Sequence, residues 1–103
     1  MHTVILIRME DNTVQVFLDG RPVSLARSLR VRKHSPTGFN AGYGGSGPAQ
    51  AALGILLMLM PKEQALRSYQ DFKFKYLARS KYLEVGKHEF TFSVDDIDKA
   101  GEQ

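Results

Sequence analysis

A glycine-rich stretch followed by a long apolar run constrains the fold of this chain more than any other feature. The stretch covers residues 34–50, and residues 51–60 follow it without a single polar side chain. Ser46-Gly47-Pro48 predicts a helix start, because Ser or Gly caps a helix and Pro fits its first turn. A helix over residues 48–60 would have no polar face, so we expect it to be the buried central helix.

Length and composition narrow the class of protein. The chain has 103 residues, of which 43% are hydrophobic, and carries a formal net charge of +3. This length predicts one domain, residues 1–103. Cysteine is absent, and His2, His34 and His88 lack ligand spacing, so we expect neither a metal nor a cofactor. Because we find neither a signal peptide nor an apolar run near the ~20 residues that span a bilayer, we expect a cytoplasmic protein without membrane contact.

Alternating apolar residues predict strands in the first third of the chain. Residues 2–9 and 13–18 read as two strands, and Asp19-Gly20 as a hairpin turn. Residues 21–25 should pair back, with Pro22 at a sheet edge. Residues 28–33 alternate apolar and basic side chains and predict a further strand whose outer face is basic.

Helical spacing and a second turn pattern describe the rest of the chain. A stripe of apolar residues predicts an amphipathic helix over residues 62–78. Residues 82–85 and 89–92 should form a closing hairpin, and a short helix should follow Ser93 to about Ala100. We therefore expect an α+β fold, in which a small antiparallel sheet packs against a buried central helix and a second amphipathic helix.

The glycine-rich stretch also predicts a ligand site. Backbone N–H groups at a helix start favour anions, and flexible glycines leave them open to a phosphate. The spacing matches neither a Walker A loop nor a dinucleotide fingerprint, so a loop that merely passes over the central helix is the alternative. The candidate ligand-binding residues are Arg30, Arg32, His34, Ser35, Tyr43, Gly44, Gly45, Ser46, Gly47, Gln50 and Lys73.

Catalysis is not expected from these residues. Ser35 or Ser46 with His34 or His88 would form a dyad, yet no carboxylate is placed to orient the histidine. We therefore assign no catalytic residue and expect a binding protein.

Three segments of the chain together resemble a known family. They read His-Ser-Pro-x-Gly-Phe at residues 34–39, Gly-Tyr-Gly-Gly-Ser-Gly-Pro-Ala-Gln at 42–50 and Tyr-Gln-x-Phe-Lys at 69–73. This pattern is similar to that of small uncharacterised proteins from bacteria, phages and prophages, over roughly residues 14–78. The chain departs from it at Asn40-Ala41, where the family pattern has an acidic residue and a tryptophan, and in residues 81–92. The resemblance implies an accessory protein of a phage or mobile element.

These observations lead to two expected functions of different classes. The first is an accessory binding protein that inhibits a host defence system by holding a host protein complex, or a nucleotide signal bound at the glycine-rich loop. The second is a nucleic-acid-binding protein that uses the basic strand and a helix face, since residues 21–34 carry no acid. Steep salt dependence would indicate nucleic acid. Self-association into a homo-oligomer would instead indicate a structural protein.

Overall fold

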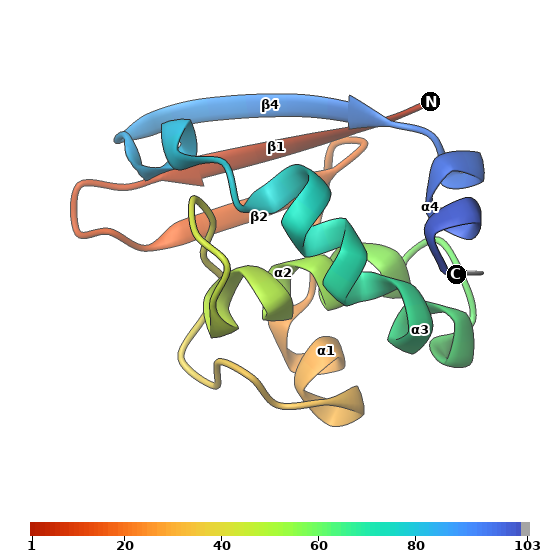
Figure 1. Ribbon diagram of the computed structural model, residues 1–103. Helices are drawn as coiled ribbons and strands as arrows, with labels where there is room; N and C mark the ends of the chain where they lie inside the picture. Colours follow the sequence, from red (N-terminus) through yellow and green to blue (C-terminus); the bar gives the residue numbers. More distant parts are fainter. Residues whose placement is uncertain (102–103) are drawn as a thin grey trace.

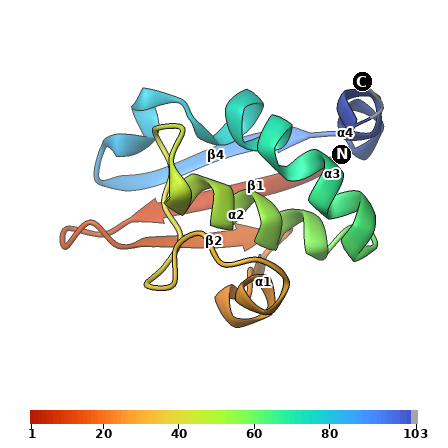
Figure 2. The ribbon, with the colours of Figure 1, turned by 60° about the horizontal axis from the view of Figure 1, so that its bottom comes forward.

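A four-stranded antiparallel sheet forms one layer of the molecule, and helices cover one of its faces (Figures 1 and 2). The computed structural model describes the backbone of residues 1–101 and the side chains of residues 1–97. The strands are β1 (His2–Arg8), β2 (Val14–Leu18), β3 (Arg21–Pro22) and β4 (Gly86–Phe92), in the spatial order β3-β2-β1-β4. The expected α+β fold class is confirmed.

The predicted hairpin between β2 and β3 forms as the turn residues require. Asp19 and Gly20 both have positive φ, 51° and 81°, which matches the twist of a tight two-residue hairpin. β1 pairs with β2 in the register Val4 opposite Leu18 and Arg8 opposite Val14. Because strand side chains alternate, one face of β1 is buried under the helices, and its last inward position belongs to Arg8.

The predicted central helix is α2 (Ser46–Leu57), which lies across β1 and β2 (Figure 2). Leu53, Ile55 and Leu56 are fully buried in it, as its lack of a polar face predicts. The helix starts and ends slightly earlier than expected, so Leu59 lies beyond its end and is only partly buried.

The second predicted helix forms in two parts. α3 (Lys62–Phe72) continues as the π-helical segment η1 (Lys73–Leu77), whose wider turn is marked by the bond from Ala78 N–H to the Lys73 carbonyl. This extra residue in the turn shifts which side chains face inward. Lys73 and Leu77 of this segment are buried, and Phe74 is exposed.

The predicted basic strand over residues 28–33 is wrong, because this segment forms α1 (Leu25–Val31) and a short coil. Ser24 caps the helix by accepting a hydrogen bond from Arg27 N–H. Pro22 limits β3 to two residues, and the alternation in residues 28–33 is too short to outweigh a capped helix. Arg30 lies in the last turn of α1, and Arg32 follows it.

The predicted closing hairpin is also wrong. Residues Ser80–Leu83 form a 3₁₀ helix, η2, and β4 pairs over its whole length with β1, from His2 opposite Phe92 to Arg8 opposite Gly86. β4 therefore pairs with β1, which is distant in the sequence, and not with the neighbouring residues 82–85. The final helix α4 (Val94–Gly101) follows Ser93, close to its predicted bounds. No helix within residues 1–101 combines the length and apolar character needed to cross a membrane.

Candidate functional site: a cleft between the glycine-rich loop and the β1–β2 turn

Gln50 holds the start of the glycine-rich loop. Its side-chain oxygen accepts the N–H groups of His34 and Ser35 at 2.7 and 3.0 Å. Its amide nitrogen donates to the Ser28 hydroxyl and the Arg32 carbonyl at 2.8 and 3.0 Å. One fully buried amide thus joins α1 and the loop to α2, and all its hydrogen-bonding capacity is used.

The far end of the loop is held by η1. Gly42 N–H donates to the Leu77 carbonyl at 2.8 Å, and Lys73 Nζ donates to the Gly44 carbonyl at 3.0 Å. Lys73, which the sequence suggested as a ligand-binding residue, is instead buried against the loop, and only 5% of it is exposed.

His34 joins the loop to α3. Its Nε2 and the Tyr69 hydroxyl share a hydrogen bond of 2.7 Å, and the two rings lie 5.5 Å apart. Burial lowers the pKa of His34 below its ordinary value, and the positive charges of Arg32 and Lys73 lower it further. The imidazole is therefore neutral near pH 7, in a locally positive environment.

The middle of the loop rests on Arg8, which is 5% exposed. Its Nη2 donates to Asn40 Oδ1 at 2.6 Å and to the Ala41 carbonyl at 3.0 Å. Nε donates to the Tyr82 carbonyl at 2.9 Å, and Nη1 to the Asn12 carbonyl at 3.3 Å. All four acceptors are neutral oxygens, and within residues 1–97 no carboxylate lies within 4.0 Å of the guanidinium. The N–H groups of the guanidinium are thus hydrogen-bonded, but no carboxylate of the described residues neutralises its positive charge.

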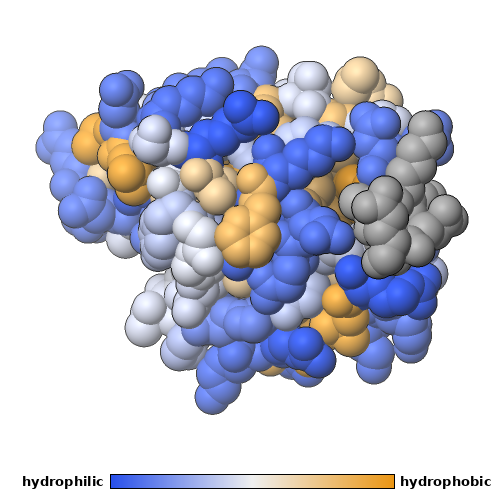
Figure 3. Space-filling model, in the orientation of Figure 1, coloured by the Kyte–Doolittle hydropathy of each residue, from blue (hydrophilic) through white to orange (hydrophobic). Residues whose placement is uncertain are grey.

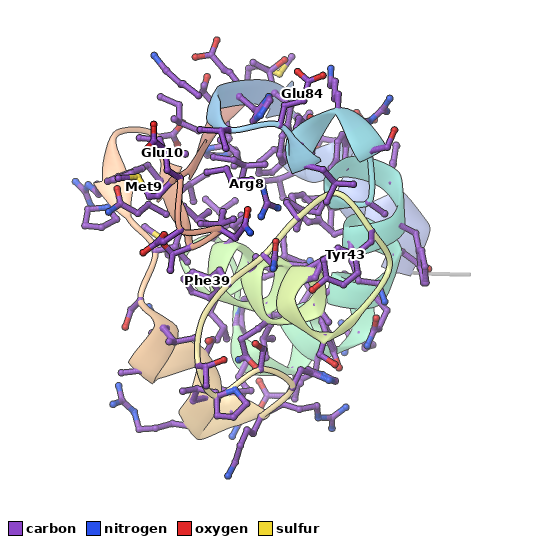
Figure 4. All side chains as sticks on the ribbon, turned by 90° about the vertical axis from the view of Figure 1, so that its left-hand side faces the viewer. Arg8, Met9, Glu10, Phe39, Tyr43 and Glu84 are labelled. Atoms are coloured by element: carbon purple, nitrogen blue, oxygen red, sulfur yellow. The ribbon has the colours of Figure 1, made fainter. Side chains whose placement is uncertain are left out.

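A cleft of about 270 Å³ lies between this part of the loop and the β1–β2 turn. Figure 4 shows Arg8 pointing toward the glycine-rich loop, which carries Phe39 and Tyr43. Within the described part of the chain, the cleft is lined by hydroxyl, amide and aromatic side chains and by no carboxylate. The lining residues are Asn12, Thr13, Val14, Ser35, Thr37, Gly38, Phe39, Asn40, Tyr43 and Gly47. Two of them, Asn12 and Asn40, accept hydrogen bonds from Arg8.

Two acidic residues stand near Arg8 without entering the cleft. Glu10 and Asp11 border, with Arg8, a wider opening on the other side of the β1–β2 turn. The Asp11 carboxylate accepts the hydroxyl and the N–H of Thr13, and these bonds lower its pKa. The Asp11 carboxylate thus already forms its hydrogen bonds within the β1–β2 turn.

The Tyr43 ring covers the first turn of α2. A Cβ built on Gly45 would lie 2.5 Å from Tyr43 Cε2, and one on Gly47 would lie 3.2 Å from its hydroxyl and overlap the Cβ of Asn40. Gly44, Gly45 and Gly47 do not have positive φ, so close approach rather than backbone conformation explains these glycines.

The predicted site residues separate into three groups. Ser35, Tyr43 and Gly47 line the cleft. His34, Gly44, Gln50 and Lys73 make the hydrogen bonds that hold the loop. Arg30, Arg32 and Ser46 are exposed outside the cleft, and Gly45 caps α2.

The sequence analysis missed Arg8, Asn12, Thr13 and Asn40. The signal for Arg8 was present, because it continues the inward alternation of Val4 and Leu6. A basic residue at an inward strand position requires buried oxygen acceptors, which marks it for attention.

The comparisons with known proteins concern this same region. Residues 8–103 match the family described as "Family of unknown function (DUF6166)". The chain belongs to this family. The DUF6166 match begins at Arg8 and so includes every residue that lines the cleft. Neither a curated protein nor a solved structure matches the chain. Among the described residues, no group of three or more His, Asp or Glu side chains is arranged to hold a metal ion.

Proposed function

We propose that this protein is a small cytoplasmic binding module that holds a phosphate-bearing ligand in the glycine-loop cleft. The observation that carries the proposal is the buried Arg8 guanidinium, whose hydrogen-bond partners are all neutral. A buried cation without a counter-charge raises the local potential, and an anion bound nearby would be stabilised by it.

The cleft side chains suit such a ligand. The hydroxyls of Ser35 and Thr37 can donate to phosphate oxygens, and Phe39 supplies an aromatic wall. Phe39 is positioned by an antiparallel bridge to Val14. A volume of about 270 Å³ lies just below the ~300–1,000 Å³ of most ligand sites. One phosphate with a small attached group, as in a nucleoside monophosphate, is therefore the expected ligand class.

Asn40→Asp tests this proposal with almost no change in shape. The new carboxylate would take the position of Asn40 Oδ1, 2.6 Å from Arg8 Nη2, and neutralise the guanidinium. The matched control is Gln15→Glu, which makes the same change of net charge at an exposed position outside the cleft lining. Calorimetric titration with inorganic phosphate, adenosine and adenosine monophosphate measures the affinity of each variant.

We expect adenosine monophosphate and phosphate to bind the wild type and Gln15→Glu, and to bind folded Asn40→Asp at least about tenfold more weakly. Equal binding by Asn40→Asp would show that Arg8 does not attract the ligand. Adenosine binding as tightly as its monophosphate would overturn the phosphate assignment. The phage or mobile-element context, including inhibition of a host defence system, stays a prediction.

Nucleic-acid binding is the second candidate function, and charge distribution favours it. Residues 20–62 contain no Asp or Glu, while Arg27, Arg30 and Arg32 are exposed on and just after α1. The basic surface is thus part of a helix and not of the expected strand. Fluorescence anisotropy with a labelled oligonucleotide between 50 and 200 mM salt tests it, because binding to backbone phosphates should weaken steeply over that range. Arg27→Glu with Arg30→Glu should abolish that binding.

A further inference from the structure

Two large apolar side chains stand exposed on either side of the glycine-rich loop. Phe74 is 63% exposed and Leu83 is 52% exposed. A Cβ on Gly44 would lie 2.9 Å from Phe74 Cε1, and one on Gly42 would lie 2.7 Å from Leu83 Cγ. Because these glycines have no side chains, Phe74 lies against the exposed backbone of Gly44, and Leu83 covers the buried backbone of Gly42.

The Phe74 ring is held in place although it faces solvent. Lys73 Nζ lies 4.0 Å from the ring centroid while it donates to the Gly44 carbonyl. This cation–π contact fixes the ring against the loop. An aromatic side chain ordered before binding loses little entropy when a partner covers it, which favours its use as an anchor.

The segment that carries both apolar residues is strongly basic. Residues 73–87, which carry Phe74 and Leu83, contain four exposed cations and a single acid, Glu84. The exposed cations are Lys75, Arg79, Lys81 and Lys87. Figure 3 shows apolar patches set among hydrophilic side chains on the face of the molecule that α3 and η1 turn toward the viewer in Figure 1.

We propose that Phe74, Leu83 and the exposed backbone of Gly44 form a docking surface for an acidic segment of a partner protein. An apolar side chain of that segment packs on the loop between Phe74 and Leu83, and its carboxylates pair with the exposed basic side chains of residues 73–87. The charge of residues 73–87 selects this occupant, since a second copy of the same basic surface would be repelled. This surface adjoins the ligand cleft at Tyr43, which lines the cleft, but neither proposal depends on the other.

Selection from a random peptide library on the immobilised protein tests the proposal. We expect the enriched peptides to carry Asp or Glu around a large apolar residue. Their dissociation constants, measured by fluorescence anisotropy, should rise at least about tenfold for Phe74→Ser with Leu83→Ser. Both residues are exposed, so the double variant should keep the wild-type circular dichroism spectrum and melting temperature.

A matched pair of charge variants separates this surface from the basic surface of α1. Lys75→Glu with Lys81→Glu should abolish peptide binding, whereas Arg27→Glu with Arg30→Glu should leave it unchanged. Peptides that bind the Phe74→Ser, Leu83→Ser variant as tightly as the wild type would overturn the proposal. The absence of acidic enrichment would overturn it too, and so would equal loss of binding in both charge variants.

Discussion

Arg8 and Asn40 form a hydrogen bond of 2.6 Å that joins the end of β1 to the middle of the glycine-rich loop. Asn40 Oδ1 also accepts the N–H of Ala41, so one oxygen shapes the loop and holds the guanidinium. This contact gives the cleft one of its walls and leaves the Arg8 charge without a neutralising partner.

Two substitutions of Asn40 should differ in their effect on the stability of the protein. Asn40→Leu removes an acceptor from a buried charged donor and should lower the free energy of unfolding by about 1.5–3 kcal/mol. Asn40→Asp keeps the acceptor and adds an opposite charge, so it should unfold at a higher urea concentration than Asn40→Leu. Urea denaturation at pH 7 measures both. Two variants of equal stability would mean that the Arg8–Asn40 bond contributes nothing.

Gln50→Leu should destabilise the protein severely. The substitution leaves two buried N–H groups, of His34 and Ser35, without their acceptor, and two further groups without their donor. Because each unsatisfied buried group costs about 1–3 kcal/mol, we expect a loss of at least about 3 kcal/mol. Gln15→Leu, at an exposed position of β2, should stay within about 0.5 kcal/mol. Thermal unfolding followed by circular dichroism compares the two, and similar melting temperatures would contradict the role of Gln50.

Two glycines at the start of α2 should respond differently to alanine. In Gly47→Ala the new Cβ meets the Cβ of Asn40, a half-buried loop residue that Arg8 holds in place, and we expect a loss of about 1–3 kcal/mol. In Gly45→Ala it meets the exposed ring of Tyr43, which can rotate away, so the loss should be smaller. Chemical denaturation gives both values. A larger loss of stability for Gly45→Ala than for Gly47→Ala would show that the loop adjusts to a new Cβ more easily than the Tyr43 ring does.

The lowered pKa of His34 should make stability depend on pH. The unfolded chain binds a proton at this residue near pH 6.5, and the folded protein resists it because of burial, Arg32 and Lys73. The stabilisation is thus fully present above the ordinary pKa and is lost as the pH falls toward the lower folded value. The melting temperature of the wild type should fall more between pH 7.5 and 5.5 than that of His34→Gln. Parallel profiles would rule out His34 as the source of this slope.

The same pKa shift provides a check on ligand binding. An anion near Arg32, His34 and Lys73 would oppose the positive charges that lower the pKa, and so would raise it. Nuclear magnetic resonance titration of His34 with and without adenosine monophosphate therefore reports whether the bound phosphate reaches this side of the loop.

Local sequence patterns were sufficient to predict several of the secondary-structure elements. Asp19-Gly20 specifies a tight hairpin turn because both residues tolerate positive φ, and the apolar residues 51–57 have no stable place except the core. The amphipathic stripe of residues 62–78 likewise predicts the helical segments that cover α2. In each case the deciding interactions lie within a few residues of one another.

Tertiary structure decided the rest, for a common physical reason. Residues 86–92 pair with residues of β1 that lie 78 to 90 positions away, and no local pattern encodes that partner. The burial of Lys73 against the loop, and the cleft between the loop and the β1–β2 turn, arise only when the loop, the sheet and η1 meet. The sequence by itself determined which segments must be buried or turn. The fold determined which distant groups satisfy the buried polar atoms, because those hydrogen bonds join residues that only packing brings together.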